Sequence, residues 1–283
     1  MNQTAIDSWI EQSGSPDQKE LRQAIHMVLI AISKSSFLQA NMIMKGGVLL
    51  AIRFKSTRHT KDIDFSSPEL FSDFDENKLL TELEIGLILA GEILDYALDC
   101  KIQSYKLSPT KEDATFQTLS INIGYARKGT AKHKKLMLKK SPSILSIDFS
   151  FNEHNLAVDI LDLDGGAKIK AYSLIDLTGE KYRAIIQQKY RNRTRRQDAY
   201  DIYVLLKNGY LDDQNLKTQI LMSLKTKAAS RDLNIDKHTL RDPDIVKRSR
   251  KEYEDLALEI VEELPPFDKV YGMVADFYES LPW

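Results

Sequence analysis

Apolar positions recur with two different periods along the first half of the chain. Helical spacing follows the capping pair Ser15-Pro16 and returns in residues 48–54 and 78–89, so helices are expected there. Strict alternation of apolar and polar residues predicts strands at residues 62–65, 117–125 and 143–151. The basic segment between the last two strands, residues 127–140, is expected to be a hairpin end or a loop.

The second half of the chain has a different pattern. A last short strand is expected at residues 168–172, after turn residues at 160–167. Helical spacing then predicts helices at residues 174–191, 195–206, 252–264 and 270–281. The fold class is therefore α+β, with a mixed sheet and helices in residues 1–168 and an all-helical domain in residues 169–283.

Composition narrows the possible partners only slightly. The 283 residues carry 40 Lys and Arg against 41 Asp and Glu, so no global charge attracts nucleic acid or membrane. The single cysteine, Cys100, excludes an internal disulfide and a zinc site built from cysteines. The N-terminal segment lacks the pattern of a signal peptide, and no segment has the length and apolarity of a membrane span. We expect a cytoplasmic protein.

The first candidate for chemistry is the strand that contains Asp62-Ile63-Asp64. Residues two apart on a strand point to the same side, so both carboxylates lie together. Two adjacent carboxylates repel each other unless a cation lies between them, and hard oxygen ligands suit Mg²⁺ together with substrate phosphates. The simpler reading is a strand end with two solvated acids, and this motif alone does not exclude it.

Two glycines and a lysine precede the short helix upstream of that strand. Gly46 and Gly47 have no side chains, so backbone N–H groups at the helix start can approach a triphosphate, and Lys45 adds a positive charge. A simple turn into a helix is the alternative.

A site for two metal ions needs a third acid. Asp148 lies between Ile147 and Phe149, and alternation places it on the face of Ser146 and Ser150. If this strand pairs with the Asp62–Asp64 strand, three carboxylates converge and can hold two metal ions for an in-line displacement. The competing acids are Asp159, Asp162 and Asp164, which lie in a less regular stretch.

Together these residues resemble a known family. The order K-G-G, a short apolar helix, and then R-x-T-x-D-I-D-F is similar to the AbiEii/AbiGii nucleotidyltransferase toxins, relatives of the MenT toxins in the polymerase-β-like superfamily. The matching residues are Lys45, Gly46, Gly47, Arg58, Thr60, Asp62, Asp64 and Phe65. Asp148 matches the third strand acid of that family. The resemblance covers roughly residues 40–66, 143–152 and 173–206.

The helical half carries the second part of the resemblance. The family's helical signature has a lysine near a helix start, followed by an Arg-Asp-x-x-Asp segment. These positions correspond to Lys181, Asp198 and Asp201. The two aspartates are three residues apart on one helix face, so they are expected to pair with Lys181. Two departures stand out: Gly47 replaces the usual serine, and Gln197 replaces the usual arginine, for which Arg195 or Arg196 is a candidate substitute.

The resemblance implies a magnesium- or manganese-dependent enzyme that transfers an NMP from an NTP to an acceptor and releases pyrophosphate. In this reading Asp62, Asp64 and Asp148 hold the metal ions. The triphosphate is bound by Lys45, Gly46 and Gly47, with Arg58, Thr60 and Asp201 contributing to the nucleotide site. Lys181 neutralises transition-state charge and is positioned by Asp198. The biology implied is that of a toxin in a type IV toxin–antitoxin or phage-defence system, with a cognate antitoxin and a tRNA 3′ end as acceptor.

The acceptor remains open at the level of sequence. Basic residues concentrate at 127–140 and 181–196, and such strips suit an RNA backbone, although a solvated face is their commonest role. Tyr125, Tyr182 and Tyr190 are candidates for stacking on bases or for the core. A protein or small-molecule acceptor is the alternative enzyme reading, and a non-catalytic nucleotide- or RNA-binding relative is the alternative without an enzyme.

Overall fold

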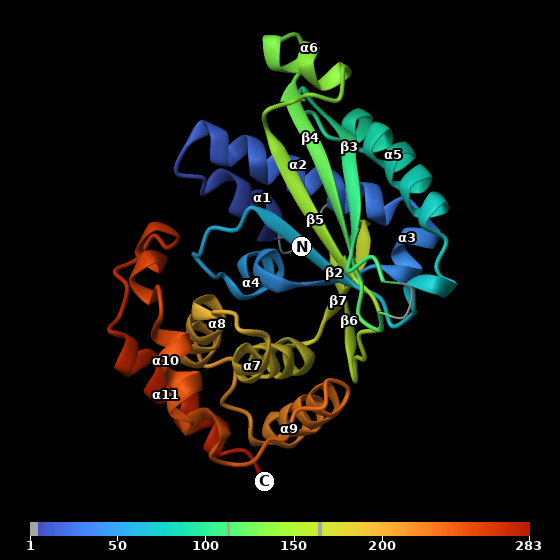
Figure 1. Cartoon of the computed structure of the whole chain (residues 1–283). Helices are drawn as coiled ribbons and strands as arrows, with labels where there is room; N and C mark the ends of the chain where they lie inside the picture. The colour runs from blue at the N-terminus through green and yellow to red at the C-terminus, as the bar shows by residue number, and fades with distance from the viewer. Residues whose placement is uncertain (1–4, 112–113, 164–165) are drawn as a thin grey trace. The chain divides into compact units, whose positions relative to one another are not determined.

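The computed structural model describes residues 5–111, 114–163 and 166–283, so Asp164 and Gly165 lie outside the described residues. Its described part forms a seven-stranded mixed sheet with the order β3-β4-β5-β2-β1-β7-β6 (Figure 1). The strands are β1 (Ile43–Lys45), β2 (Asp62–Ser66), β3 (Leu98–Ser108), β4 (Thr118–Arg127), β5 (Ile144–Ser150), β6 (Val158–Asp162) and β7 (Lys168–Tyr172). The expected α+β class is confirmed.

Helices precede, interrupt and follow the strands. Those of the first half are α1 (Ala5–Glu11), α2 (Pro16–Ser33), α3 (Ser36–Asn41), α4 (Gly46–Phe54), α5 (Glu76–Ile93) and α6 (Ala131–Met137). Those of the second half are α7 (Leu174–Arg191), α8 (Arg196–Lys207), α9 (Gln214–Ala229), α10 (Pro243–Arg250) and α11 (Phe267–Glu279). No helix in the described ranges combines the length and the apolarity that crossing a membrane requires.

The chain divides into two compact units, and neither is one continuous segment. The sheet unit comprises Met1–Arg53, Thr60–Glu153 and Val158–Ala171. The helical unit comprises Tyr172–Trp283 together with two short pieces, Phe54–His59 and His154–Ala157. The expected division of the chain into domains of residues 1–168 and 169–283 stays a prediction.

The two faces of the sheet differ sharply within the sheet unit. On β4 and β5, every second residue is completely buried: Leu119, Ile121, Ile123, Leu145, Ile147 and Phe149 are each 0% exposed. Helix α2 contacts β3 and β5, and helix α5 contacts β3, so these helices cover the apolar face (Figure 1). The intervening residues point to the opposite face, and this face carries the candidate chemistry.

Several expected elements differ from the structure. Residues 127–140 contain the helix α6, because the Thr130 side chain accepts a hydrogen bond from the His133 N–H and caps its start. The prediction of a helix at residues 252–264 is wrong. Glu252 has φ 59°, and only a 3₁₀ segment, η4 (Tyr253–Leu258), forms there. Pro265 disfavours helical geometry at the residue before it.

Candidate active site

The strand β2 presents its two aspartates on one side of the sheet. Ile63 and Phe65 are 0% exposed, whereas Asp62 is exposed and Asp64 is half-buried. The apolar side chains between and after the acids anchor the strand in the core. Both carboxylates therefore project from a rigid element.

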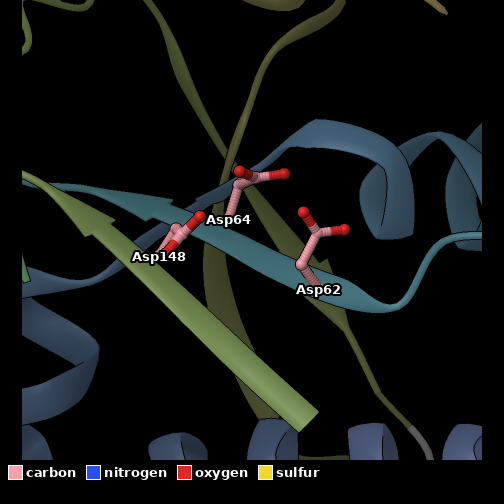
Figure 2. Close-up of side chains that lie close together, drawn as sticks. All are labelled: Asp62, Asp64 and Asp148. Carbon is pink, nitrogen blue, oxygen red and sulfur yellow. The ribbon is translucent and has the colours of Figure 1, made fainter. Parts of the chain in front are cut away.

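The third acid comes from the neighbouring strand. Strand β5 pairs in parallel with β2, and Asp148 lies directly opposite Asp64 in the register. Carboxylate oxygens of Asp62, Asp64 and Asp148 all lie within 4.8 Å of one another. Figure 2 shows the three side chains on the same side of the two strands, turned toward a common space. The pairing on which the third acid depended is confirmed.

Hydroxyl groups hold two of the three carboxylates. Thr60 donates from Oγ1 to Asp62 Oδ1 at 2.8 Å. Ser120 on β4 donates from Oγ to Asp148 Oδ1 at 2.7 Å. Each bond holds one oxygen of its carboxylate. Ser120 was not identified as a site residue, because its pairing with Asp148 depends on the register between β4 and β5.

Gly46 begins helix α4 and touches the cluster. Its φ is +75°, and a Cβ built on it would lie 1.8 Å from Asp64 Oδ2. Only glycine therefore leaves room for the Asp64 carboxylate at this position. Gly47 follows as a buried residue, and Lys45 lies opposite Asp64 in the β1–β2 register. The Lys45 side chain is largely buried, with Nζ 3.9 Å from Glu153 Oε1.

The competing acids have other partners. Asp159 on β6 forms an ion pair with Arg53 at 2.6 Å. Asp162, on the same strand, lies 3.6 Å from the Lys168 ammonium. Asp164 falls outside the described residues. Asp148 is thus the acid that joins Asp62 and Asp64.

The helical unit contains a second, buried cluster of charges. Lys181 on α7 donates to Asp198 Oδ1 at 3.1 Å and to Asp201 Oδ2 at 2.6 Å, both on α8. Asp201 is 1% exposed and Lys181 is 6% exposed. The expected pairing of this lysine with both aspartates is confirmed.

Arg58 belongs to the same cluster. It donates from Nε to Asp201 Oδ1 at 3.1 Å and from Nη2 to Asp201 Oδ2 at 3.2 Å, a bidentate pair. Its Nη1 also lies 3.6 Å from Glu259 Oε2. The fork joins residues 143 positions apart in the sequence. Arg58 therefore fixes Asp201 within the helical unit.

The charges of this cluster shift one another's proton affinities. Burial raises the pKa of Asp201, but Arg58 and Lys181 outweigh that effect and hold the pKa below its usual value. Burial lowers the pKa of Lys181, but Asp201 and Asp198 outweigh it and the pKa lies above its usual value. Asp201 and Lys181 are consequently both charged at neutral pH.

Comparison with known proteins assigns the chain to a family. A family model described as nucleotidyl transferase AbiEii toxin, type IV TA system, matches residues 29–273 of the 283. The chain belongs to the AbiEii family. No curated protein sequence matches it. The AbiEii chain is accordingly a nucleotidyltransferase of a toxin family.

Solved structures show that the fold is shared at low sequence identity. MenT4, a nucleotidyltransferase toxin from Mycobacterium tuberculosis, is 12% identical with a TM-score of 0.53, covering 98% of this chain and 89% of that one. A Helicobacter pylori protein assigned as a nucleotidyltransferase is 14% identical with a TM-score of 0.52, covering 94% and 96%. JHP933 from the same species is 14% identical with a TM-score of 0.51, covering 94% of both chains.

The two departures from the family signature can be placed in the AbiEii chain. Arg195 lies 4.0 Å from Asp198 Oδ2. Arg196 instead pairs with Glu252 at 3.2 Å and with Glu259 at 3.0 Å. Of the two candidates to replace the arginine missing at Gln197, Arg195 is the one next to Asp198.

The acid cluster of the AbiEii chain fits a divalent cation. Asp62 and Asp148 each bond to a hydroxyl group, and no Lys or Arg of the described residues forms an ion pair with either one. Three like charges within 4.8 Å are costly unless a cation neutralises them. Carboxylate oxygens are the ligands that Mg²⁺ and Mn²⁺ favour.

The aromatic candidates for base stacking separate by exposure. Tyr182 is 0% exposed and Tyr125 is 7% exposed, so both belong to the core. Tyr190 is 60% exposed at the end of α7. Of these three candidates, Tyr190 is the one exposed enough to stack on a base.

Proposed function

We propose that this AbiEii-family toxin is a magnesium-dependent nucleotidyltransferase that moves an NMP from an NTP to the 3′ end of a tRNA. The observation that supports this most is the convergence of Asp62, Asp64 and Asp148 beside a glycine-started helix. Both substrates are cytoplasmic molecules, so the reaction would take place there. A cognate antitoxin would restrain it in the cell.

The proposed metal ligands are Asp62, Asp64 and Asp148. When bound, Mg²⁺ or Mn²⁺ would supply positive charge to the phosphate oxygens. The chain's own residues then bind and orient the donor. The N–H groups of Gly46 and Gly47 and the ammonium of Lys45 bind the triphosphate, and Thr60 keeps Asp62 oriented.

The helical-unit residues enter the proposal through the family signature. We assign Lys181 to charge neutralisation on the phosphates. Asp198 and Asp201 position its ammonium, since both bond to it. Arg58 contributes to the nucleotide site by holding Asp201 in place with its bidentate fork.

The experiment that tests the function is incubation of the purified protein with total tRNA, Mg²⁺ and each labelled NTP in turn. The matched control is the double variant Asp62→Ala/Asp64→Ala. Label on tRNA from one NTP, absent with the variant, is the expected result. Labelled protein, or pyrophosphate release without labelled tRNA, would keep the transfer and overturn the RNA acceptor.

A cellular assay tests the toxin role separately. Expression of the wild type is expected to inhibit growth, and Asp64→Ala is expected to abolish the inhibition while the protein stays folded. A folded Asp64→Ala variant that remained toxic would overturn the role of this carboxylate. NTP binding without any transfer or pyrophosphate release would favour a non-catalytic relative.

A further inference from the structure

The face of the sheet that carries Asp148 continues well beyond the acid cluster. Nine residues of β3, β4 and β5 share it by register and alternation. They are Ser104, Lys106, Ser108, Thr118, Ser120, Asn122, Ser146, Asp148 and Ser150. The three on β3 are exposed and the other six are half-buried. We call these nine residues the polar face.

Hydrogen bonds tie the polar face together across the strands. Ser146 donates to Asn122 Oδ1 at 3.0 Å, and Asn122 donates to Ser104 Oγ at 3.0 Å. Ser120 and Asp148 form the next row toward the acid cluster, with Lys106 opposite Ser120. These cross-strand pairs extend from the exposed residues of β3 to Asp148.

Hydroxyl, amide and lysine side chains dominate the polar face. Eight of its nine residues are hydroxyl, amide or lysine side chains, and Asp148 is its single acid. Lys101, opposite Gly124 on the same side of the sheet, adds a second positive charge. Hydroxyl and amide groups can bond to sugars, phosphates and bases, and the lysines can neutralise phosphates.

The polar face and the proposed triphosphate site lie on opposite sides of Asp64, as transfer requires of the acceptor and the leaving group. An in-line displacement requires the attacking oxygen and the leaving pyrophosphate on opposite sides of the reacting phosphorus. Gly46 and Lys45, proposed to bind the triphosphate, lie on the β1 side of Asp64. The polar face lies on the β5 side of Asp64, beyond Asp148.

We propose that the polar face binds the 3′-terminal nucleotides of the RNA acceptor, with Lys101 and Lys106 contacting its phosphates. This inference rests on the proposed function and assigns the acceptor site within it. The terminal hydroxyl oxygen forms a bond to the α-phosphorus of the NTP. The bond from that phosphorus to the bridging oxygen breaks, and its electron pair leaves on pyrophosphate. The hydroxyl proton is released to water.

The test uses the full chain with the charge-reversal variant Lys101→Glu/Lys106→Glu. We expect the KM for tRNA to rise roughly 10-fold or more, while kcat and the Kd for NTP stay unchanged. The slope of the logarithm of the tRNA binding constant against the logarithm of salt concentration should become shallower by about one for each lysine. The control is Lys34→Glu, an exposed lysine at the end of α2, the helix that covers the opposite face.

The outcomes separate this inference from the function on which it rests. Wild-type transfer to tRNA with an unchanged KM in the double variant would overturn the acceptor site and leave the function standing. A rise of the same size in Lys34→Glu would show a nonspecific charge effect and would also overturn it. If the wild type labels protein and not RNA, both the acceptor and its site are wrong. Circular dichroism of both variants confirms that they are folded.

Discussion

The two charged clusters of this protein differ in the partners that hold their carboxylates. In the sheet unit, three carboxylates converge within 4.8 Å, and two of them are held by neutral hydroxyl groups. In the helical unit, Asp201 is surrounded by the cations of Arg58 and Lys181 and is almost completely buried. We propose that a divalent cation balances the first cluster, whereas the second contains the cations that pair with its acid.

This difference separates what each cluster does for the molecule. Removing an acid from the sheet cluster relieves repulsion between carboxylates, so the free energy of unfolding should not fall. Activity should fall, because the removed acid is a proposed metal ligand. Removing an acid from the helical cluster leaves a buried cation without its partner, so it should reduce stability. The variants below test this contrast.

The largest effect is expected for Asp64→Asn. Transfer should fall about 10³-fold or more, because a proposed metal ligand is lost. The free energy of unfolding without metal should be unchanged or higher. Thermal unfolding with and without Mg²⁺ checks the cause: the ion should raise the Tm of the wild type and not that of the variant. A large loss of stability without metal would contradict the contrast.

The next effect is expected for Asp201→Asn, which should lower the free energy of unfolding by about 3–5 kcal/mol. The loss arises because Arg58 and Lys181 remain buried with one charged partner fewer. Urea unfolding measures it. The matched control is Asp268→Asn, a surface acid paired with Arg250 and 79% exposed, for which less than about 1 kcal/mol is expected.

Acid should remove the same stabilisation. The pKa of Asp201 is lowered in the folded state, so its contribution is present above the unfolded pKa and is lost as the pH falls through the folded value. The stability difference between wild type and Asp201→Asn should therefore shrink in acid. A difference that stays constant would show that charge is not its source.

A smaller effect is expected for Gly46→Ala, and Gly129→Ala is its control. Both glycines have positive φ, +75° and +80°, so each alanine should cost about 1 kcal/mol of backbone strain. Only at Gly46 would the new Cβ meet Asp64, since nothing lies within 4 Å at Gly129. Displacing the carboxylate should reduce transfer roughly 10- to 100-fold in Gly46→Ala alone. Equal losses in both variants would assign the effect to strain.

The smallest effect is expected for Ser120→Ala. Without its hydrogen bond, Asp148 is less well oriented, and the Mg²⁺ concentration for half-maximal activity should rise about 10-fold. Ser120→Thr should restore the wild-type value. Thr118→Ala changes the neighbouring position on the same face of β4, where the side chain contacts Ser150 instead, and should leave it unchanged. A metal requirement unaffected by Ser120→Ala would overturn this positioning role.

Local sequence patterns predicted much of the geometry of the two charged clusters. Alternation placed Asp148 on the correct face of its strand, and the i, i+3 spacing of Asp198 and Asp201 predicted their pairing with Lys181. The fork between Arg58 and Asp201 was not predicted, because it joins positions far apart in the sequence. Ser120 was missed because register between strands is a tertiary property.

Short elements were the hardest to predict. Strand β1 has three residues, too few to show alternation, and its identity depends on pairing with β2 and β7. Helix α6 lies in a run of lysines that offers little apolar periodicity. In neither segment is the hydrophobic periodicity strong enough to favour a strand or a helix over a loop.

The discontinuity of the helical unit has a consequence for how such a gene can evolve. Arg58 is encoded far upstream of the helix that carries Asp201, yet both belong to one unit. A single recombination event near codon 172 would bring in the helices without the arginine that fixes their buried acid. Exchange between genes that differ at this arginine would therefore leave the buried acid without its fork, so the two residues should be inherited together.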